Sequence, residues 1–219
     1  MFTYQAYAGY INTLAVLNFE NSNLEIVSDF VLRASNFLQA MPEKKAPKLI
    51  RARDITSKHQ RVGVFVDAQN MYHSARNLYK AKVNFKKVLE QAVGDRQLVR
   101  AFIYVIRTET GEEKAFVEAL EKGGYEIKEK GLQIFAGGMK KADWDVGMAM
   151  DTVRLADKID VAVLVTGDGD FVPLIEYLSV SKGLKIEVMS FGRSTSAKLK
   201  EEADVYVDLE SDPKKFLIY

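Results

Sequence analysis

The chain has 219 residues, of which 47% are apolar, and a formal net charge of +1. This composition supports a folded core and argues against a disordered tail protein, and the near-neutral charge excludes a global attraction to nucleic acid. The absence of cysteine excludes disulfides and thiolate chemistry, and two histidines leave little material for a zinc site or a catalytic triad. No stretch stays apolar over the roughly 18 residues of a membrane span, and no basic signal region begins the chain, so we expect a cytoplasmic protein.

The first block of the chain, residues 1–45, is predicted to be a helical extension. Between about Asn23 and Met41, apolar residues recur at steps of three and four, as on one face of a helix. Pro42 and Pro47 interrupt this pattern, and residues 46–60 form a locally basic linker. Two roles stay open for the extension: dimerisation or docking of a protein partner, and packing on the chain's own second domain.

Strands and helices alternate from residue 61 to residue 210, which predicts one α/β domain followed by a tail over residues 211–219. Runs rich in valine and isoleucine predict strands at residues 62–66, 99–107, 132–135, 161–165, 185–190 and 205–209. Helices are predicted over residues 71–79, 85–93, 112–123, 145–158, 171–181 and 196–202. Continuous apolar strands separated by helices imply a mostly parallel sheet that helices cover on both faces.

An aspartate directly follows the first predicted strand of this domain. Asp67 ends the run Phe65-Val66-Asp67-Ala68-Gln69-Asn70, and Asn70 stands at the start of the next helix. Either residue could simply cap that helix, since both types do so well. Capping explains one of them more readily than both, so we expect Asp67 to have a functional role at the carboxyl end of its strand, where ligands bind in open parallel sheets.

Two further aspartates follow the predicted strand at residues 161–165. The segment Thr166-Gly167-Asp168-Gly169-Asp170 could be a tight turn, in which glycine and aspartate are common. It lacks the third glycine of a dinucleotide loop and the Gly-Lys-Ser/Thr of a P-loop. A metal-binding loop fits better, with Asp168 as a ligand, Asp170 as its partner or as a helix cap, and Thr166 orienting a carboxylate or a water.

A third acidic segment begins the helix predicted at residue 145. Asp145 is the ligand candidate, although acidic residues in a first helical turn are also favourable on dipole grounds alone, and Asp143 is interpreted as a cap. Asp151 lies about 240° further around the helix, so it is interpreted as a second ligand or as a residue that supports the ligands. Lys140 and Lys141 precede this segment, in a turn that could simply be solvated.

These motifs, in this order and at these separations, are similar to those of a known family. The three segments 65–70, 145–151 and 166–174 resemble the NYN domain family, most closely its LabA-like branch within the PIN-like nuclease superfamily, over residues 61–209. The resemblance implies a PIN-like three-layer α/β sandwich and metal-dependent ribonuclease chemistry. It carries a site onto residues that match the motifs: Asp67, Asn70, Asp145, Asp168 and Asp170. Trp144 departs from the small aliphatic residue that is usual there.

The resulting hypothesis is hydrolysis of RNA, single-stranded or structured, by one or two Mg²⁺ or Mn²⁺ ions. Asp67, Asp145 and Asp168 would be the metal ligands, and Asn70 would position a water or a phosphate oxygen. Trp144 would stack a base, while Lys140, Lys141 and Arg193 would hold the RNA backbone. Two other functions stay open, a non-catalytic module that binds RNA or protein on a PIN-like scaffold and a phosphatase for small phosphate esters.

Overall fold

The computed structural model describes residues 57–219, except for residues 108–112, 132, 135–139 and 142–143. The predicted extension over residues 1–45, most of the predicted linker and Asp143 therefore lie outside the described residues. Lys140 and Lys141 are described as backbone only. Every helix in the described part is too short or too polar to cross a lipid bilayer.

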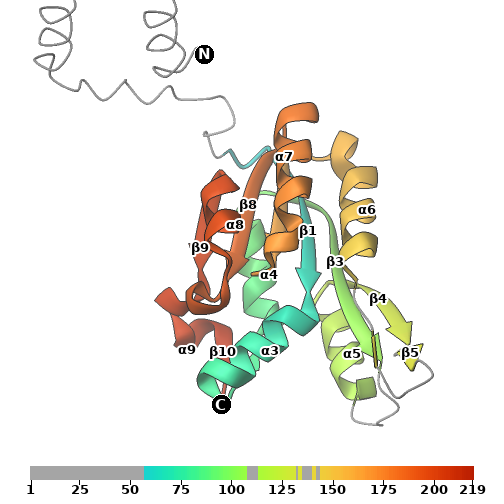
Figure 1. Cartoon of the computed structure of the whole chain (residues 1–219), viewed down its shortest axis with the longest axis vertical. Coiled ribbons are helices and arrows are strands. Elements are labelled where there is room, and N and C mark those ends of the chain that lie inside the picture. Colours follow the sequence, from blue (N-terminus) through green and yellow to red (C-terminus); the bar gives the residue numbers. More distant parts are fainter. Residues whose placement is uncertain (1–56, 108–112, 132, 135–139, 142–143) are drawn as a thin grey trace, which may run out of the picture. The chain divides into compact units, whose positions relative to one another are not determined.

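Six parallel strands form the central sheet, in the order β4-β3-β1-β7-β8-β9 (Figure 1). Their bounds are Arg61–Asp67 for β1, Gln97–Arg107 for β3, Glu126–Gly131 for β4, Val161–Val165 for β7, Lys185–Ser190 for β8 and Val205–Asp208 for β9. All residues of β7 and β8 are buried, as expected for central strands covered on both sides. The mostly parallel sheet inferred from the sequence is confirmed.

Helices cover both faces of the sheet and complete a three-layer sandwich (Figure 1). On one face lie α3 (Ala68–Tyr79), α4 (Phe85–Val93) and α5 (Glu113–Lys122). On the other face lie α6 (Asp145–Leu155), α7 (Val172–Ser181) and α8 (Ala197–Glu202). Four single-turn helices follow or connect these elements: η2 (Ala156–Lys158), η3 (Gly169–Phe171), η4 (Gly192–Ser194) and η5 (Leu209–Ser211).

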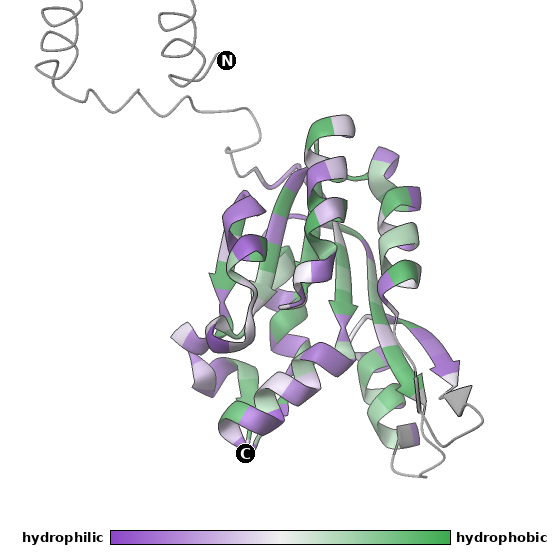
Figure 2. Cartoon of the chain, viewed as in Figure 1, coloured by the Kyte–Doolittle hydropathy of each residue, from purple (hydrophilic) through white to green (hydrophobic). Residues whose placement is uncertain are grey.

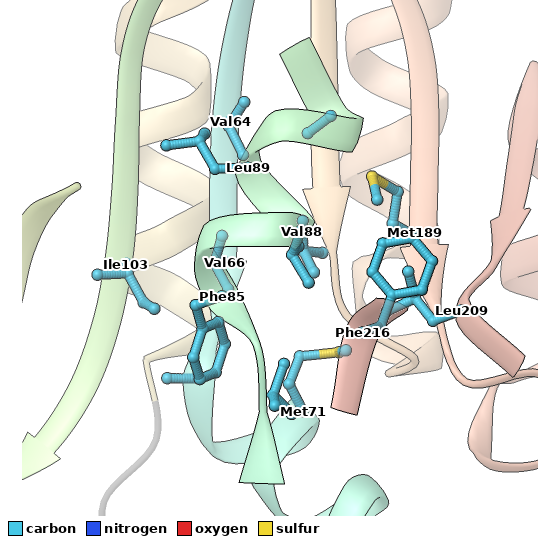
Figure 3. Close-up of a cluster of buried hydrophobic side chains, with 14 of the residues drawn as sticks. Val64, Val66, Met71, Phe85, Val88, Leu89, Ile103, Met189, Leu209 and Phe216 are labelled. Carbon is cyan, nitrogen blue, oxygen red and sulfur yellow. The ribbon is translucent and has the colours of Figure 1, made fainter. Parts of the chain in front are cut away.

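Strand β1 shows how the sequence supplies both cores. Val64 and Val66 face the α3–α4 side, where they join Met71 and Val88 in one cluster (Figure 3). Phe65 belongs to the cluster on the α6–α7 side. A strand that contributes to two cores has no polar face, which is why the run reads as continuously apolar. Figure 2 shows the same contrast, with hydrophobic inner strands and a hydrophilic edge strand β4.

The last residues are part of the fold and do not form the tail that the sequence analysis predicted. Helix α9 (Pro213–Phe216) leads into β10 (Leu217–Ile218), which pairs antiparallel with β2 (Lys82–Val83). Phe216 and Leu217 are buried in the α3–α4 core. This short pairing depends on a partner far along the chain, so no local pattern indicates it.

The strand predicted at residues 132–135 lies partly outside the described residues. Within the described residues it is β5 (Gln133–Ile134), which pairs antiparallel with β6 (Lys140–Lys141) apart from the central sheet. The edge strand β4 was not predicted, because its sequence, Glu-Ile-Lys-Glu-Lys-Gly, is mostly charged. Charged residues are common on edge strands, where they discourage pairing with other chains.

The topology creates a crevice at one edge of the sheet. From β1 the chain builds outward to β3 and β4, then crosses back to β7 on the other side of β1 and continues to β8 and β9. Ligands of open α/β sheets bind outside the carboxyl ends of the strands at such a reversal. The residues that follow β1 and β7 are therefore brought together.

Candidate metal centre and active-site cavity

A cavity of about 500 Å³ lies at the carboxyl ends of β1 and β7. Three carboxylates from separate segments line it, namely Asp67, Asp145 and Asp168. The remaining lining is mostly neutral and polar, and consists of Gln69, Asn70, His73, Ser74, Asn77, Leu78, Tyr104, Trp144 and Ser194. The structure thus brings together the aspartates of all three motifs.

Asp67 both caps a helix and faces the cavity. Its Oδ1 accepts a hydrogen bond from the Asn70 N–H at 2.9 Å, which satisfies one of the unpaired donors at the start of α3. Burial raises the pKa of the Asp67 carboxyl to about 6, the Asn70 N–H opposes this, and the charges of Asp145 and Asp168 reinforce it. Capping and a place in the acidic cavity are therefore compatible.

The loop after β7 is shaped by its own side chains. The buried Thr166 accepts a hydrogen bond from the Asp168 N–H through Oγ1 at 3.2 Å. Asp168 Oδ1 in turn accepts from the Asp170 N–H at 3.0 Å. Thr166 therefore orients the segment that carries Asp168. Asp168 combines the role of a turn residue with a place in the cavity, and Asp170 is exposed beside it.

Glycine is required in this loop by close neighbours. A Cβ on Gly167 would lie 2.9 Å from the backbone oxygen of Ser194, and one on Gly169 would lie 2.8 Å from the Ser196 hydroxyl. Both glycines thus let the loop after β7 pack against the segment after β8.

Trp144 forms part of the cavity wall immediately before Asp145. Its Nε1–H donates to the Val105 carbonyl at 3.0 Å, and its ring lies 5.4 Å from that of Tyr104. The indole also covers Gly147, where a Cβ would lie 2.6 Å from Trp144 Cε3. The unusual tryptophan is therefore matched by a glycine three residues later, and it holds the start of α6 against β3.

Three carboxylates lie close to the spacing expected of a cation site. Oxygens of Asp145, Asp168 and Asp170 all lie within 4.8 Å of one another. Two oxygens that bind one Mg²⁺ at about 2.1 Å are at most about 4.2 Å apart, so a small closure suffices. The donor set, carboxylate oxygens alone, is the kind that hard divalent cations prefer. Asp67 is outside this trio but faces the same cavity.

Asp151 points to other partners. It accepts a hydrogen bond from the Tyr104 hydroxyl at 3.3 Å and pairs with Lys128 at 3.4 Å and Arg154 at 3.3 Å. Burial, with the charge of Asp151, raises the pKa of Tyr104 well above its usual range, so the phenol stays a neutral donor. Asp151 thus reaches the cavity only indirectly, through Tyr104 in its wall.

Of the three cationic residues expected to contact RNA, the structure describes the side chain of Arg193. Arg193 Nε pairs with Glu210 at 2.9 Å, and its guanidinium lies over the Tyr79 ring at 5.1 Å. Its neighbour Ser194 lines the cavity, so Arg193 is close to the rim but already has an acidic partner. The side chains of Lys140 and Lys141 lie outside the described residues.

Several lining residues were not predicted. Tyr104 is level with Asp67 in the parallel pairing of β3 with β1, a register that the sequence alone does not give. Gln69, His73 and Asn77 recur every four residues on one flank of α3. That spacing could have indicated a shared surface once Asp67 was chosen as a site residue. His73 is exposed and also borders the cavity.

Comparisons with known proteins agree with the fold and the motifs. The profile of the NYN domain family matches residues 61–210. The Low amplitude and bright protein LabA of Synechococcus elongatus is 28% identical over 165 residues, which are 72% of this chain and 87% of that protein. The crystal structure of a protein of unknown function from Vibrio parahaemolyticus matches with a TM-score of 0.68 and 29% sequence identity. The match covers 75% of this chain and 99% of that chain. The chain therefore belongs to the NYN domain family, in its LabA-like branch.

Proposed function

We propose that this protein is a metal-dependent ribonuclease that hydrolyses RNA phosphodiester bonds in the cavity at the ends of β1 and β7. The observation that carries the proposal is the convergence of Asp67, Asp145 and Asp168, which come from three separate segments, on one cavity. Like charges so close together are costly unless a proton or a cation compensates them. Membership in a PIN-like family supports this chemistry.

The proposed ligands are Asp67, Asp145 and Asp168, with Asp170 beside them. A bound Mg²⁺ or Mn²⁺ would polarise a phosphoryl oxygen and lower the pKa of a water molecule. No residue of the described cavity wall would then need to act as a general base. Thr166 orients the Asp168 loop, and Asp151 supports Tyr104 in the wall. Asn70 is proposed to serve the same site through its contact with the loop after β7.

The proposed substrate contacts surround this acidic centre. Trp144 lies in the cavity wall and offers a surface for stacking a base, a contact worth about 1–3 kcal/mol where it occurs. Lys140, Lys141 and Arg193 are proposed to hold the RNA backbone near the rim. For Arg193 this would require exchange of Glu210 for a phosphate, since the two side chains are paired.

The first prediction concerns cleavage by variants of the acidic centre. We expect Asp145→Asn and Asp168→Asn to lose at least about 100-fold in cleavage of labelled RNA with Mg²⁺ or Mn²⁺, because each removes a metal ligand. Asp157→Asn is the matched control, since this exposed aspartate pairs with Lys182 away from the cavity. EDTA should abolish the cleavage by the parent protein.

The outcome also separates the other functions. If both variants cut single-stranded and structured RNA as the parent does, the proposed centre is wrong. Binding of RNA without cleavage under any metal would indicate a regulatory module. Hydrolysis of small phosphate esters with RNA left intact would indicate a phosphatase.

The domain organisation follows from the same proposal. Residues 61–210 would form the nuclease domain of a cytoplasmic protein, and residues 1–45 a helical extension joined by the basic stretch 46–60. Sedimentation of the chain with and without residues 1–45 would show whether the extension mediates dimerisation. An oligomeric state that is the same with and without these residues would leave docking of a different protein or packing on the nuclease domain.

A further inference from the structure

One flank of α3 is bonded to both of the loops that follow the neighbouring strands. Asn70 Oδ1 accepts a hydrogen bond from the Gly167 N–H, in the loop after β7, at 3.0 Å. One turn further along α3, Ser74 Oγ accepts from the Ser194 hydroxyl, in the segment after β8, at 2.8 Å. Residues four apart share a helix face, so both bonds leave α3 on the same side.

The two loops are also bonded to each other, which closes a ring. The Gly167 carbonyl accepts a hydrogen bond from the Ser196 N–H at 3.0 Å. The ring, here called the clasp, therefore comprises Asn70, Ser74, Gly167, Ser194 and Ser196. Gly167 is at its centre, with both its N–H and its carbonyl engaged, and its missing side chain leaves room for the Ser194 backbone.

The clasp surrounds the base of the acidic loop. Asp168 directly follows Gly167, and Asp67 caps the same turn of α3 from which the Asn70 side chain extends. A bond between Asn70 and Gly167 thus joins the segments that carry two of the carboxylates. Those carboxylates repel each other when ionised, so an unrestrained loop would move away from Asp67.

We infer that Asn70 is a positioning residue, and that the clasp holds the acidic loop at its spacing before any cation arrives. This inference rests on the proposed function only where it concerns the cation. It differs from a role in which Asn70 donates directly to a water or a phosphate. In the clasp the side chain acts through its oxygen, which accepts from Gly167.

Two substitutions of Asn70 distinguish these roles. Asn70→Asp keeps an oxygen that can accept from the Gly167 N–H but removes the amide donor. Asn70→Ala removes both groups. If Asn70 acts through the clasp, the aspartate variant should keep the parent's rate of Gly167 exchange and the alanine variant should not. If Asn70 acts by donating to substrate or water, both variants should lose RNA cleavage to the same extent.

The experiment measures the loop and the cation separately. Amide exchange of Gly167 in metal-free protein, followed by NMR, should be at least about 10-fold faster in Asn70→Ala than in the parent. Mn²⁺ affinity, measured by electron paramagnetic resonance, should fall about 10- to 100-fold, as when groups that orient metal ligands are removed. Asn70→Asp should keep the exchange of Gly167 within about 3-fold of the parent, and its Mn²⁺ affinity should not fall, because it adds a carboxylate to the acidic cavity.

A matched control and a milder variant complete the design. Gln91→Ala removes an exposed side-chain amide on α4, which is bonded to Lys215 outside both the cavity and the clasp, and should leave both readouts unchanged. Ser74→Ala removes only the bond to Ser194 and should speed Gly167 exchange by a smaller factor. It carries the test if Asn70→Ala does not fold.

The results divide clearly. Unchanged exchange and Mn²⁺ affinity in Asn70→Ala, or exchange of Gly167 that is equally fast in Asn70→Asp, overturns the positioning role. A parent protein that binds no Mn²⁺ overturns the proposed function instead, while the exchange of Gly167 still decides whether the clasp exists.

Discussion

At the scale of single residues, the site is built from side chains that have two tasks. Asp67 caps α3 and faces the cavity, and Asp168 accepts the Asp170 N–H and faces the same cavity. The structural role of each aspartate is therefore compatible with the functional role proposed for it. The local hydrogen bonds fix the direction of each carboxylate.

Asp67 also gives a prediction about pH. Its pKa is raised in the folded protein from 3.8 to about 6, so the folded state holds this proton more tightly than the unfolded state. Its contribution is neutral below about pH 4, becomes unfavourable between pH 4 and 6, and is fully unfavourable above pH 6. We expect Asp67→Asn to raise the free energy of unfolding by about 1–3 kcal/mol over that of the parent at pH 8, with little difference at pH 4.

Asparagine caps a helix about as well as aspartate, so this change isolates the charge. The measurement is urea unfolding of metal-free protein at both pH values. A gain of the same size at pH 4 and pH 8 would show that the charge of Asp67 is not its source.

The site also marks the limit of reasoning from sequence at this scale. Asp67, Asp145 and Asp168 could be predicted because each stands beside a strand or helix end that the pattern reveals. Tyr104 and Ser194 could not, because their places depend on the pairing of β3 with β1 and on the packing of two loops. Asp151 is interpreted from the sequence as a second ligand or as a residue that supports the ligands, and its partners in the structure are Tyr104, Lys128 and Arg154.

At the scale of elements, local patterns predict the buried strands and the amphipathic helices but miss what depends on distant partners. The run 161–165 coincides with β7, and residues 85–93 coincide with α4. The charged edge strand β4 has no apolar run, and β2 and β10 have two residues each, so tertiary packing defines these strands.

A buried ion pair between two elements gives a prediction at this scale. Arg96 binds both oxygens of Glu187 on β8 at 2.8 Å and also donates to the carbonyls of Ala92 and Val93, at the end of α4. Arg96→Met would leave Glu187 buried with only Lys185 nearby and would free the α4 carbonyls. We expect a loss of about 3 kcal/mol in urea unfolding at pH 7.

The chain offers a matched control for this change. Arg100 makes a similar two-bond pair with Glu126, but both side chains are nearly half exposed. Arg100→Met should cost less than about 1 kcal/mol, because exposed pairs are well solvated. Equal losses for the two arginines would mean that burial does not determine the strength of these pairs.

At the scale of the whole domain, the C-terminal segment closes the core beneath the helix that carries the site. Phe216 is 3% exposed and packs in the cluster that includes Met71 on α3 and Leu209 (Figure 3). The adjacent β10 pairs with β2, which follows α3 in the chain. The last residues therefore stabilise α3, the helix that carries Asn70 and that Asp67 caps.

This arrangement predicts that the end of the chain contributes to stability out of proportion to its length. Phe216→Ala should lower the free energy of unfolding by about 3–5 kcal/mol, because it removes a large buried ring and leaves a cavity. Tyr219→Ala, at an 81% exposed position three residues later, should change it by less than about 0.5 kcal/mol. Urea unfolding of both variants measures the difference. If the Phe216→Ala protein were as stable as the Tyr219→Ala protein, the packing of α9 and β10 would contribute nothing to the core that contains Met71 of α3.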